Sequence, residues 1–402
     1  MRKGSPALPA FPAPERGLPV LPELADRLTR TASRTTPEPL GGGAALREAA
    51  CGYWARRGLS ARPADVLAAP GPQALLLALL ASAGGEVLLT RPCATWYAPL
   101  ARLAGRLAYH VPVPAECGGV PDPFALLETV RRIRTEGGRP RFLVLSVADD
   151  TTGTIAPPEI LHEVCEAAAA EGLTVISDET WRDIRHDAHA TVFVGPAEMD
   201  HERVVVLTEL SGVLLPAAWP AAVALFPSSP AGLTLRTRAQ AVLTALRAEL
   251  PPPVAVAAEY ALTEPAAVAA RAAAAARLYG TVARAVHRRT AEAGVLARPP
   301  QTGPHLYADL GELREALAAR AITDSVELEE RLSTVLGHPV PGGHRFGDDP
   351  DALRVRLSVL PLLGAGDDQR LQALDAADPL RSPVVGTALA TLGAVFGELA
   401  AT

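Results

Sequence analysis

Two polar stretches in the middle of the chain decide the fold. Residues 146–154 read Ser-Val-Ala-Asp-Asp-Thr-Thr-Gly-Thr, and residues 173–183 read Leu-Thr-Val-Ile-Ser-Asp-Glu-Thr-Trp-Arg-Asp. An apolar run over 142–147 leads into the first stretch, and a helical pattern from Pro158 to Glu171 separates it from the second. Each stretch therefore reads as a short buried strand that ends in polar residues. A strand–helix–strand unit of this kind is typical of a parallel sheet with helices on both faces.

The same alternation continues on both sides of this unit. The predicted helices cover 44–54, 73–80, 98–104, 158–171 and 264–294, and the predicted strands cover 86–89, 107–113, 142–147, 174–177 and 204–207. The Pro- and Gly-rich start predicts an extended arm that ends in a glycine turn. We therefore predict an α/β fold: an N-terminal arm (1–45), a large domain (46–265) with a mainly parallel central sheet, an interdomain helix (266–298) and a smaller α/β C-terminal domain (299–402).

The composition fits this size of protein and carries one unusual count. The chain has 402 residues, a net charge of −6 and 49% apolar residues, enough for one large or two medium domains. Lys3 is the only lysine, and the other 37 basic residues are arginine. Any mechanism that needs a lysine after position 3 is therefore excluded by the sequence.

Charge, hydropathy and cysteine spacing indicate which partners to expect among nucleic acids, membranes and metal ions. A slightly acidic chain without basic runs predicts no nucleic-acid partner. We find no apolar run of about 20 residues, which predicts no membrane span, and no signal-peptide pattern, which predicts a cytoplasmic protein. Four cysteines without metal-ligand spacing read as reduced thiols, so no metal site is expected. These cysteines are Cys51, Cys93, Cys117 and Cys165.

Several stretches, in the same order along most of the chain, resemble class I/II aminotransferases, which depend on pyridoxal phosphate (PLP). The two central stretches resemble the NPxNPTG and SDExY segments of that family. The resemblance implies the PLP-dependent transferase fold type I and a homodimer with active sites at the subunit interface. The other matching stretches are 71–75, 92–105, 204–220, 341–347 and 354–358.

Several positions that hold PLP in that family carry other residues here. The resemblance implies a lysine that bonds covalently to PLP, and Gly212 stands at that position. Pro220 and Glu209 stand where an arginine and a serine bind the cofactor phosphate, and a carboxylate there repels the anion. Pro72 removes an N–H from the phosphate-binding turn. Ala94 replaces the aromatic residue that stacks on the pyridine ring.

Other positions of the family's site are retained or conservatively changed. Asp178 matches the aspartate that pairs with the pyridine nitrogen, and Trp181 stands where a tyrosine is usual. Arg356 matches the arginine that binds the substrate α-carboxylate, a bidentate task suited to a guanidinium group. Tyr97 is also retained, and Asp150 replaces an asparagine that contacts the ring oxygen.

From these positions we predict the site. Carboxylates crowded in one cleft raise one another's pKa, which suits acid/base catalysis near neutral pH. The predicted catalytic residues are Asp178, Asp150 and Glu209, and the predicted substrate-binding residues are Arg356, Trp181 and Tyr97. No residue is expected to bind a cofactor, since PLP binding is predicted to be lost or weak, and none to bind a metal.

We therefore expect a PLP-independent, cytoplasmic, homodimeric enzyme. It would perform acid/base chemistry on a small amine- or amino-acid-like substrate in specialised metabolism, without a nucleic-acid or membrane partner. One alternative is a non-catalytic homologue that acts as a scaffold or binding partner. Another is a PLP-binding enzyme without a covalent bond to a lysine.

Structural interpretations of single residues also stay open. Asp178 would then be a cap between strand and helix, Glu209 would point to solvent, and Arg356 would be a surface strand residue. Arg354, two positions before Arg356, would take its place after a slip in register. His186 and His189 lie at i,i+3 spacing, but they read as solvated loop residues because no third metal ligand has diagnostic spacing.

Overall fold

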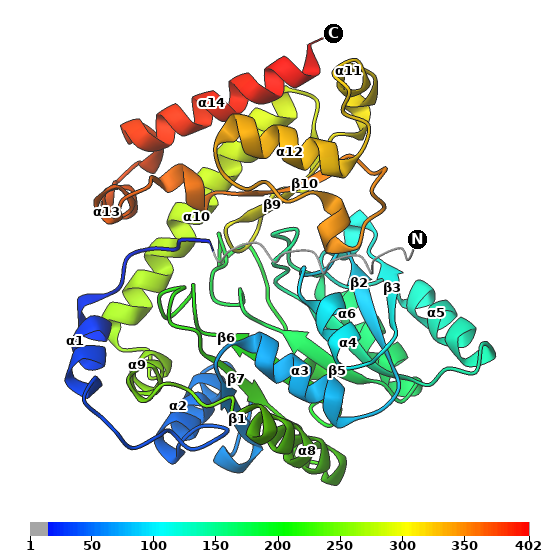
Figure 1. The fold of residues 1–402 in the computed structure, drawn as a ribbon, viewed down its shortest axis with the longest axis vertical. Helices are drawn as coiled ribbons and strands as arrows, with labels where there is room; N and C mark the ends of the chain where they lie inside the picture. Colours follow the sequence, from blue (N-terminus) through cyan, green and yellow to red (C-terminus); the bar gives the residue numbers. More distant parts are fainter. Residues whose placement is uncertain (1–14, 402) are drawn as a thin grey trace, which may run out of the picture.

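The computed structural model describes residues 15–401, and a seven-stranded sheet forms its larger layer (Figure 1). The strand order is β1-β7-β6-β5-β4-β2-β3, and β7 runs antiparallel to both of its neighbours. Strands β2 to β6 pair in parallel, so their carboxyl ends meet at one edge of the sheet. The strands are β1 (Val66–Ala69), β2 (Glu86–Arg91), β3 (Ala108–Pro112), β4 (Pro140–Ser146), β5 (Thr174–Asp178), β6 (Val204–Glu209) and β7 (Ala222–Leu225).

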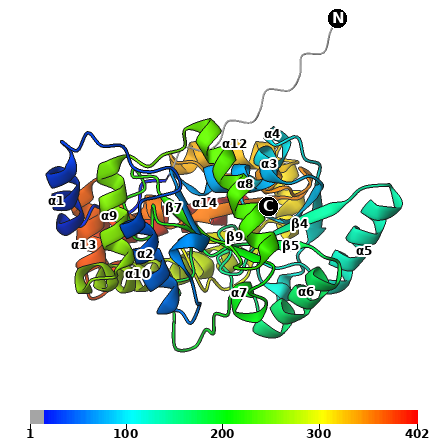
Figure 2. The same cartoon turned by 90° about the horizontal axis from the view of Figure 1, so that it is seen from below.

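Helices cover both faces of this sheet (Figures 1 and 2). Leu67 and Ala69 of β1 pack with α3, α4 and α8, whereas Val66 and Ala68 pack with the core on the other face. Burial on both faces is why these strands read as continuous apolar runs. The helices of this layer are α1 (Pro22–Thr31), α2 (Ala44–Ala55), α3 (Pro72–Ser82), α4 (Tyr97–Leu103), α5 (Pro123–Thr135), α6 (Pro158–Ala170), α7 (Pro196–Met199), α8 (Pro230–Leu246) and α9 (Pro252–Leu262).

A second, antiparallel sheet of three strands, in the order β10-β9-β8, forms the smaller layer. The long helix α10 leads into it from α9 and packs against α13 and α14 (Figure 1). The strands are β8 (Leu296–Ala297), β9 (His305–Asp309) and β10 (Arg354–Ser358). The helices are α10 (Ala266–Glu292), α11 (Arg314–Ala318), α12 (Ser325–Leu336), α13 (Asp367–Asp375) and α14 (Pro383–Ala400). Short 3₁₀ helices are η1 (Pro63–Asp65), η2 (Ala115–Cys117), η3 (Gly311–Leu313), η4 (Gly343–Phe346), η5 (Leu360–Leu363) and η6 (Pro379–Arg381).

The predicted α/β architecture is confirmed, and each predicted helix and strand overlaps an observed one. One part of the arm was predicted wrongly as extended, because α1 begins at Pro22. Proline at the first helical position, Glu23 in the first turn and Arg30 in the last turn all favour a helix there. Residues 1–14 of the predicted arm lie outside the described residues. The predicted domain boundaries stay a prediction.

A second correction concerns membrane-spanning length. Among residues 15–401, α14 is long and apolar enough to cross a membrane by length and composition, with a mean hydropathy of 1.5. The sequence reading overlooked it. A third of this helix is buried, and it packs against α10, α11 and α12.

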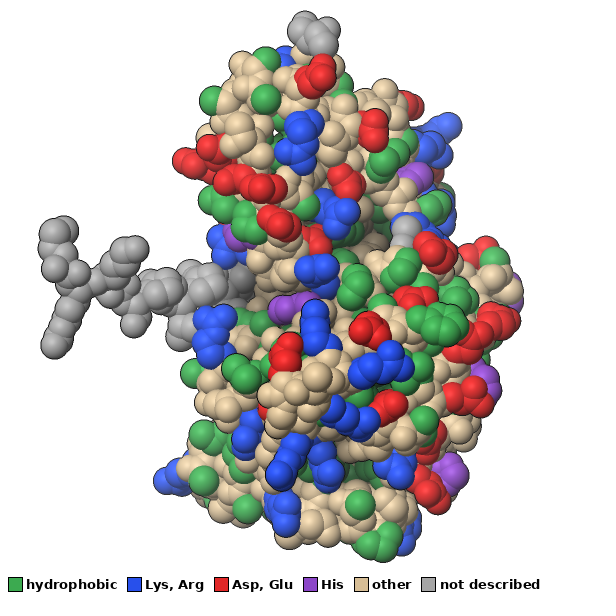
Figure 3. All heavy atoms as spheres, turned by 90° about the vertical axis from the view of Figure 1, so that its right-hand side faces the viewer, with side chains coloured by type: hydrophobic (Ala, Val, Ile, Leu, Met, Phe, Trp, Pro, Cys, Tyr) green, Lys and Arg blue, Asp and Glu red, His purple; other side chains and the backbone are tan. Residues whose placement is uncertain are grey.

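The charged side chains on the surface are of both signs, as the nearly balanced numbers of acidic and basic residues in the sequence predict. In Figure 3, acidic and basic side chains are interspersed over the face turned to the viewer. The basic side chains there are arginines, because residues 4–402 include no lysine.

Candidate functional site

Polar residues gather where the carboxyl ends of β4, β5 and β6 meet the smaller sheet. Asp150 follows β4, Asp178 ends β5, and Glu209 ends β6. The parallel register brings these ends together, because Ser146 of β4 pairs with Asp178 of β5. Strand β10 contributes Arg356 from the other layer. The crevice beyond the carboxyl ends of the strands is where open α/β sheets usually bind ligands.

Asp178 is held in a dense set of hydrogen bonds and is 4% exposed. The Tyr97 hydroxyl donates to its Oδ2 at 2.8 Å, and the Thr180 hydroxyl donates to its Oδ1 at 2.6 Å. Burial raises the pKa of Asp178, although the hydrogen bonds from Thr180 and Tyr97 oppose that rise. The structure thus brings two of the predicted site residues, Asp178 and Tyr97, into direct contact.

Asp150 joins the two sheets. Its Oδ1 accepts from Trp181 Nε1 at 2.7 Å, and its Oδ2 accepts from Arg356 Nη1 at 3.0 Å. His305 Nδ1 lies 3.1 Å from Oδ1. Burial favours a raised pKa, but the charges of His305 and Arg356 outweigh it and hold the pKa of Asp150 well below its usual range. Asp150 is therefore a fixed carboxylate rather than the proton-transferring group that the sequence predicted.

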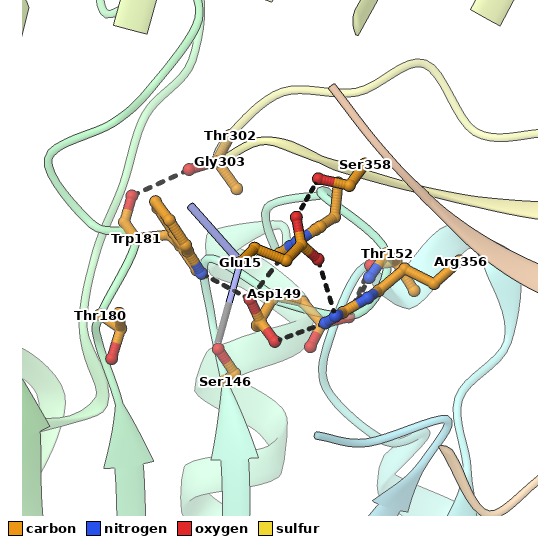
Figure 4. Close-up of polar contacts among 12 residues, drawn as sticks. Glu15, Ser146, Asp149, Thr152, Thr180, Trp181, Thr302, Gly303, Arg356 and Ser358 are labelled. Atoms are coloured by element: carbon orange, nitrogen blue, oxygen red, sulfur yellow. Dashed lines mark hydrogen bonds and ion pairs between the residues drawn. The ribbon is translucent and has the colours of Figure 1, made fainter. Parts of the chain in front are cut away.

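Arg356 also contacts the N-terminal arm, which sequence reasoning did not connect with the site (Figure 4). Its Nη2 lies 3.4 Å from Oε1 of Glu15, and His305 Nε2 lies 3.3 Å from the same oxygen. The Ser358 hydroxyl donates to Oε2 of Glu15. Burial acts to raise the pKa of Glu15, but His305, Arg356 and Ser358 together lower it to about 2. No local motif marks Glu15, so only the folded chain reveals it.

Two carboxyl groups of the site titrate near neutral pH. Burial raises the pKa of Glu209 to about 7, with Ser211 lowering it and the nearby charges of Asp178 and Asp150 raising it further. Burial also raises the pKa of Asp149 to about 7, against two hydrogen bonds from Thr152. Glu209 and Asp149 are therefore the groups of this site best suited to exchange protons.

These raised pKa values predict a fall in stability with rising pH. The folded state holds the Glu209 proton up to about pH 7, whereas the ordinary pKa is 4.5, so stability is lost as the pH rises through that window. The loss from Glu209 is on the order of 2 kcal/mol at 1.36 kcal/mol per pKa unit, reduced for partial exposure. Denaturant unfolding at about pH 5 and about pH 8 measures it. Glu209→Gln should equal wild type at the lower pH and exceed it at the higher pH; an unchanged pH slope would contradict the assignment.

The positions matched to cofactor attachment lie at the same edge. Gly212 has a φ of +82° in a tight turn where its N–H donates to the Leu215 carbonyl at 2.7 Å. A Cβ at Gly212 would have nothing within 4 Å, and a cavity of about 30 Å³ lies beside it, lined in part by Val213 and Tyr279. Gly71, with a φ of +100°, begins the turn into α3. Ala94 is 4% exposed and belongs to the core under α3 and α4.

The two loop histidines were predicted to be solvated, and this is wrong for one of them. His186 is half-buried, with its ring nitrogens 3.1 Å from the Pro300 carbonyl and 2.7 Å from the Gly303 carbonyl. His189 is exposed. Among residues 15–401, no cluster of three or more His, Cys, Asp or Glu side chains is arranged to hold a metal ion.

Residues 17–328 match the model of the family described as aminotransferase class I and II. The chain belongs to this family. The aminotransferase relatives include the probable aspartate/prephenate aminotransferase of Thermus aquaticus, 31% identical over 40% of this chain and 42% of the relative. The probable N-succinyldiaminopimelate aminotransferase of Mycobacterium tuberculosis is 35% identical over 27% of this chain and 26% of the relative. The match thus spans about two fifths or less of these relatives' length.

Solved aminotransferase structures confirm the fold. The Thermus thermophilus aspartate aminotransferase with maleate has a TM-score of 0.76 at 21% identity, covering 95% of this chain and 90% of that chain. The N-succinyldiaminopimelate aminotransferase of Mycobacterium tuberculosis has a TM-score of 0.76 at 23% identity, covering 95% and 92%. At these identities the likeness supports the fold alone.

Membership of the aminotransferase family overturns one expectation from the sequence. Class I/II aminotransferases depend on PLP, so the family match and the named relatives point to PLP as the cofactor. The prediction that this protein works without PLP is therefore wrong.

The residues of the site fit PLP at one end and not at another. The buried Asp178 carboxylate, fixed by Tyr97 and Thr180, fits the protonated pyridine nitrogen. The phosphate end fits less well, because Pro72 at the start of α3 has no N–H to donate and Glu209 places a carboxylate where the family resemblance implies a phosphate contact. Among residues 15–401 there is no lysine to bond the cofactor covalently. The site therefore fits the pyridine ring of a cofactor that is held without a covalent bond, and it lacks the family's usual phosphate contacts.

Proposed function

We propose that this protein is a PLP-using enzyme of the aminotransferase family that transfers an amino group to or from a small carboxylate-bearing substrate. It would hold the cofactor without a covalent bond, as a member of the family that lacks the cofactor-binding lysine. The observation that carries the proposal is the position of the buried Asp178 at the end of β5. The charge of Asp150 acts on Asp178, and Asp150 in turn accepts a hydrogen bond from Arg356, so the three side chains belong to one site. An amino-acid or oxo-acid substrate fits a site with a buried arginine.

The cofactor, when bound, supplies the electron-withdrawing ring that amino-group chemistry requires. Asp178 would stabilise the ring's protonated nitrogen, and Tyr97 would keep the Asp178 carboxylate oriented. Trp181, fixed through its Nε1 by Asp150, would form one apolar wall of the site.

The substrate and the proton are handled by other groups. Arg356 would bind the substrate carboxylate, because its planar guanidinium matches a carboxylate in two-point contact. Glu209 would accept and return a proton at Oε2, since the Ser211 hydroxyl already donates to Oε1. A pKa of about 7 lets Glu209 act in both directions near neutral pH.

We expect pyridoxamine phosphate and PLP to bind reversibly, and Asp178→Asn to weaken binding of pyridoxamine phosphate about tenfold or more. That change removes a charge-assisted contact worth about 1.4 kcal/mol or more. Fluorescence titration measures the dissociation constant. Asp187→Asn is the matched control, because Asp187 is an exposed aspartate on the loop that follows β5.

Covalent chemistry and turnover complete the test. Borohydride treatment with PLP, followed by peptide mass spectrometry, should leave residues 15–401 without a cofactor adduct. Supplying pyridoxamine phosphate and an oxo acid should yield the corresponding amino acid, with equimolar PLP as the other product. Failure of both cofactor forms to bind the wild-type protein would overturn the proposal.

We also propose that the protein is a cytoplasmic homodimer. The resemblance to class I/II aminotransferases supports the homodimer. Light scattering on the purified protein measures the assembly directly.

A further inference from the structure

The N-terminal arm inserts a carboxylate into the substrate side of the site. Glu15 precedes Arg356 by 341 residues, yet its side chain contacts Arg356, His305 and Ser358 of the smaller sheet (Figure 4). Its side chain is 29% exposed, whereas those of His305 and Arg356 are 7% and 11% exposed. A negatively charged group of the chain itself thus lies against both Arg356 and His305, two largely buried basic side chains of the site.

Side-chain contacts of Arg16 and Arg370 hold residues 15–17 in this position independently of Glu15. Arg16 Nη2 pairs with Oδ1 of Asp367 at 2.6 Å, and its Nη1 donates to the Ala365 carbonyl at 2.5 Å. Arg370 donates to the backbone carbonyls of Arg16 and Gly17. The arm is therefore fastened to the start of α13 directly beside the residue that enters the site.

One N–H donor of the Arg356 guanidinium group has no hydrogen-bond partner among the described residues. Its Nη1 contacts Asp150, its Nη2 contacts Glu15, and its Nε is buried without a hydrogen-bond partner among the described residues. A guanidinium group binds a single carboxylate best through two parallel N–H donors. Here the donors are divided between two carboxylates, so Glu15 accepts from Nη2 alone, whereas a carboxylate in place of Glu15 that accepted from both Nη2 and Nε would make two contacts.

The charge balance makes Glu15 and a substrate carboxylate mutually exclusive. The cluster holds the carboxylates of Asp150 and Glu15 against Arg356 and His305. Adding a further carboxylate would leave an unpaired negative charge in a largely buried site, which is costly. Binding therefore requires that Glu15 leave.

We propose that Glu15 is an internal substitute for the substrate carboxylate, and that a carboxylate ligand reaches Arg356 only by displacing the N-terminal arm. The inference rests on the proposed function only for the identity of the ligand as a carboxylate. Under this proposal the segment around Glu15 is autoinhibitory. The contacts of Arg16 and Arg370 hold it in place, and it leaves the site when the substrate carboxylate binds.

Maleate, a dicarboxylate that cannot accept or donate an amino group, is the probe. In calorimetric titration of the full-length protein, Glu15→Gln should bind maleate about tenfold tighter than wild type, because it removes the competing charge. Glu23→Gln removes the same charge from exposed α1 and should match wild type. Asp367→Asn keeps Glu15 but frees Arg16, and should tighten binding by about two- to fivefold.

Each outcome decides the inference. Maleate affinity that is equal or weaker in both Glu15→Gln and Asp367→Asn, with Glu23→Gln like wild type, overturns it. Maleate that binds none of these proteins overturns it too, while reversible binding of pyridoxamine phosphate would leave the proposed function standing. Conversely, tighter maleate binding by Glu15→Gln in a protein that binds neither cofactor form would retain the autoinhibitory arm and reject the proposed function.

Discussion

Replacing Arg356 with methionine is expected to lower the free energy of unfolding by about 3–5 kcal/mol and to abolish maleate binding. The change leaves the carboxylates of Asp150 and Glu15 partly buried with His305 as their one remaining cation. Breaking a buried ion pair by removing one partner costs this much because the other charge stays desolvated. Methionine keeps much of the side-chain volume, so the loss reports charge rather than packing.

Arg354→Met is the matched control for this prediction. Arg354 lies on the same strand, has a side chain that is 39% exposed, and pairs at 2.8 Å with Asp309, which is 35% exposed. It also pairs at 3.2 Å with Asp348, which is 5% exposed but keeps a hydrogen bond from the Tyr307 hydroxyl when Arg354 is replaced. An ion pair that water reaches contributes about 1 kcal/mol or less. Denaturant unfolding of the two variants should therefore differ by at least about 2 kcal/mol. Equal losses would mean that Arg356 does not carry the charge balance of the site.

Gly153→Ala is expected to destabilise the protein by at least about 3 kcal/mol and to weaken maleate binding. Gly153 has a φ of +69°, and a Cβ there would overlap the backbone oxygen of His305 and lie 3.2 Å from its carbonyl carbon. The Gly153 carbonyl also accepts from the backbone N–H groups of Gln301 and Thr302. An added methyl group would push the loop that contains Asp150 and Gly153 (residues 147–157, between β4 and α6) away from the smaller sheet. Asp150 would then be separated from Arg356.

Gly172→Ala isolates the cause of that loss. Gly172 has a φ of +67°, nearly the same as Gly153, but a Cβ there would have nothing within 4 Å. Its cost should be roughly 1 kcal/mol, the ordinary cost of a left-handed backbone for alanine. If the two variants lose equal stability, the close approach of the Asp150 loop to β9 is not what holds the two layers together.

The sequence predicted the larger sheet well because its signals are local. The apolar runs that become β4 and β5, and the helical pattern between them, need no information from elsewhere in the chain. The helix α1 was missed because proline-rich composition was read as extended chain, although proline at a first helical position is favourable.

The charge state of the site was less predictable, since it depends on residues far apart in sequence. Counting carboxylates places Asp150 with Asp178 and Glu209 as an acidic cluster, which suggests raised pKa values for all three. The fold adds Arg356 and His305 from the smaller sheet, and these lower the pKa of Asp150 instead. The pKa values of Asp178 and Glu209 do rise, that of Glu209 to about 7, so the argument fails for Asp150 alone among the three.

The cofactor prediction failed for a related reason. Loss of one residue type, lysine, was taken to end PLP chemistry, whereas the family match covers residues 17–328 and depends on the whole pattern. Asp178, the residue that the resemblance matches to the pyridine nitrogen, is buried and accepts hydrogen bonds from the Tyr97 and Thr180 hydroxyls.

The pairing of Asp150 with Arg356 also bears on the energetics of ligand recognition. One residue follows a strand of the larger sheet and the other lies within the smaller sheet, so their contact fixes the two walls of the crevice against each other. A site whose walls are already ordered loses little conformational entropy when a ligand arrives. The Asp150–Arg356 contact therefore lowers the ordering cost that a carboxylate ligand of Arg356 has to offset.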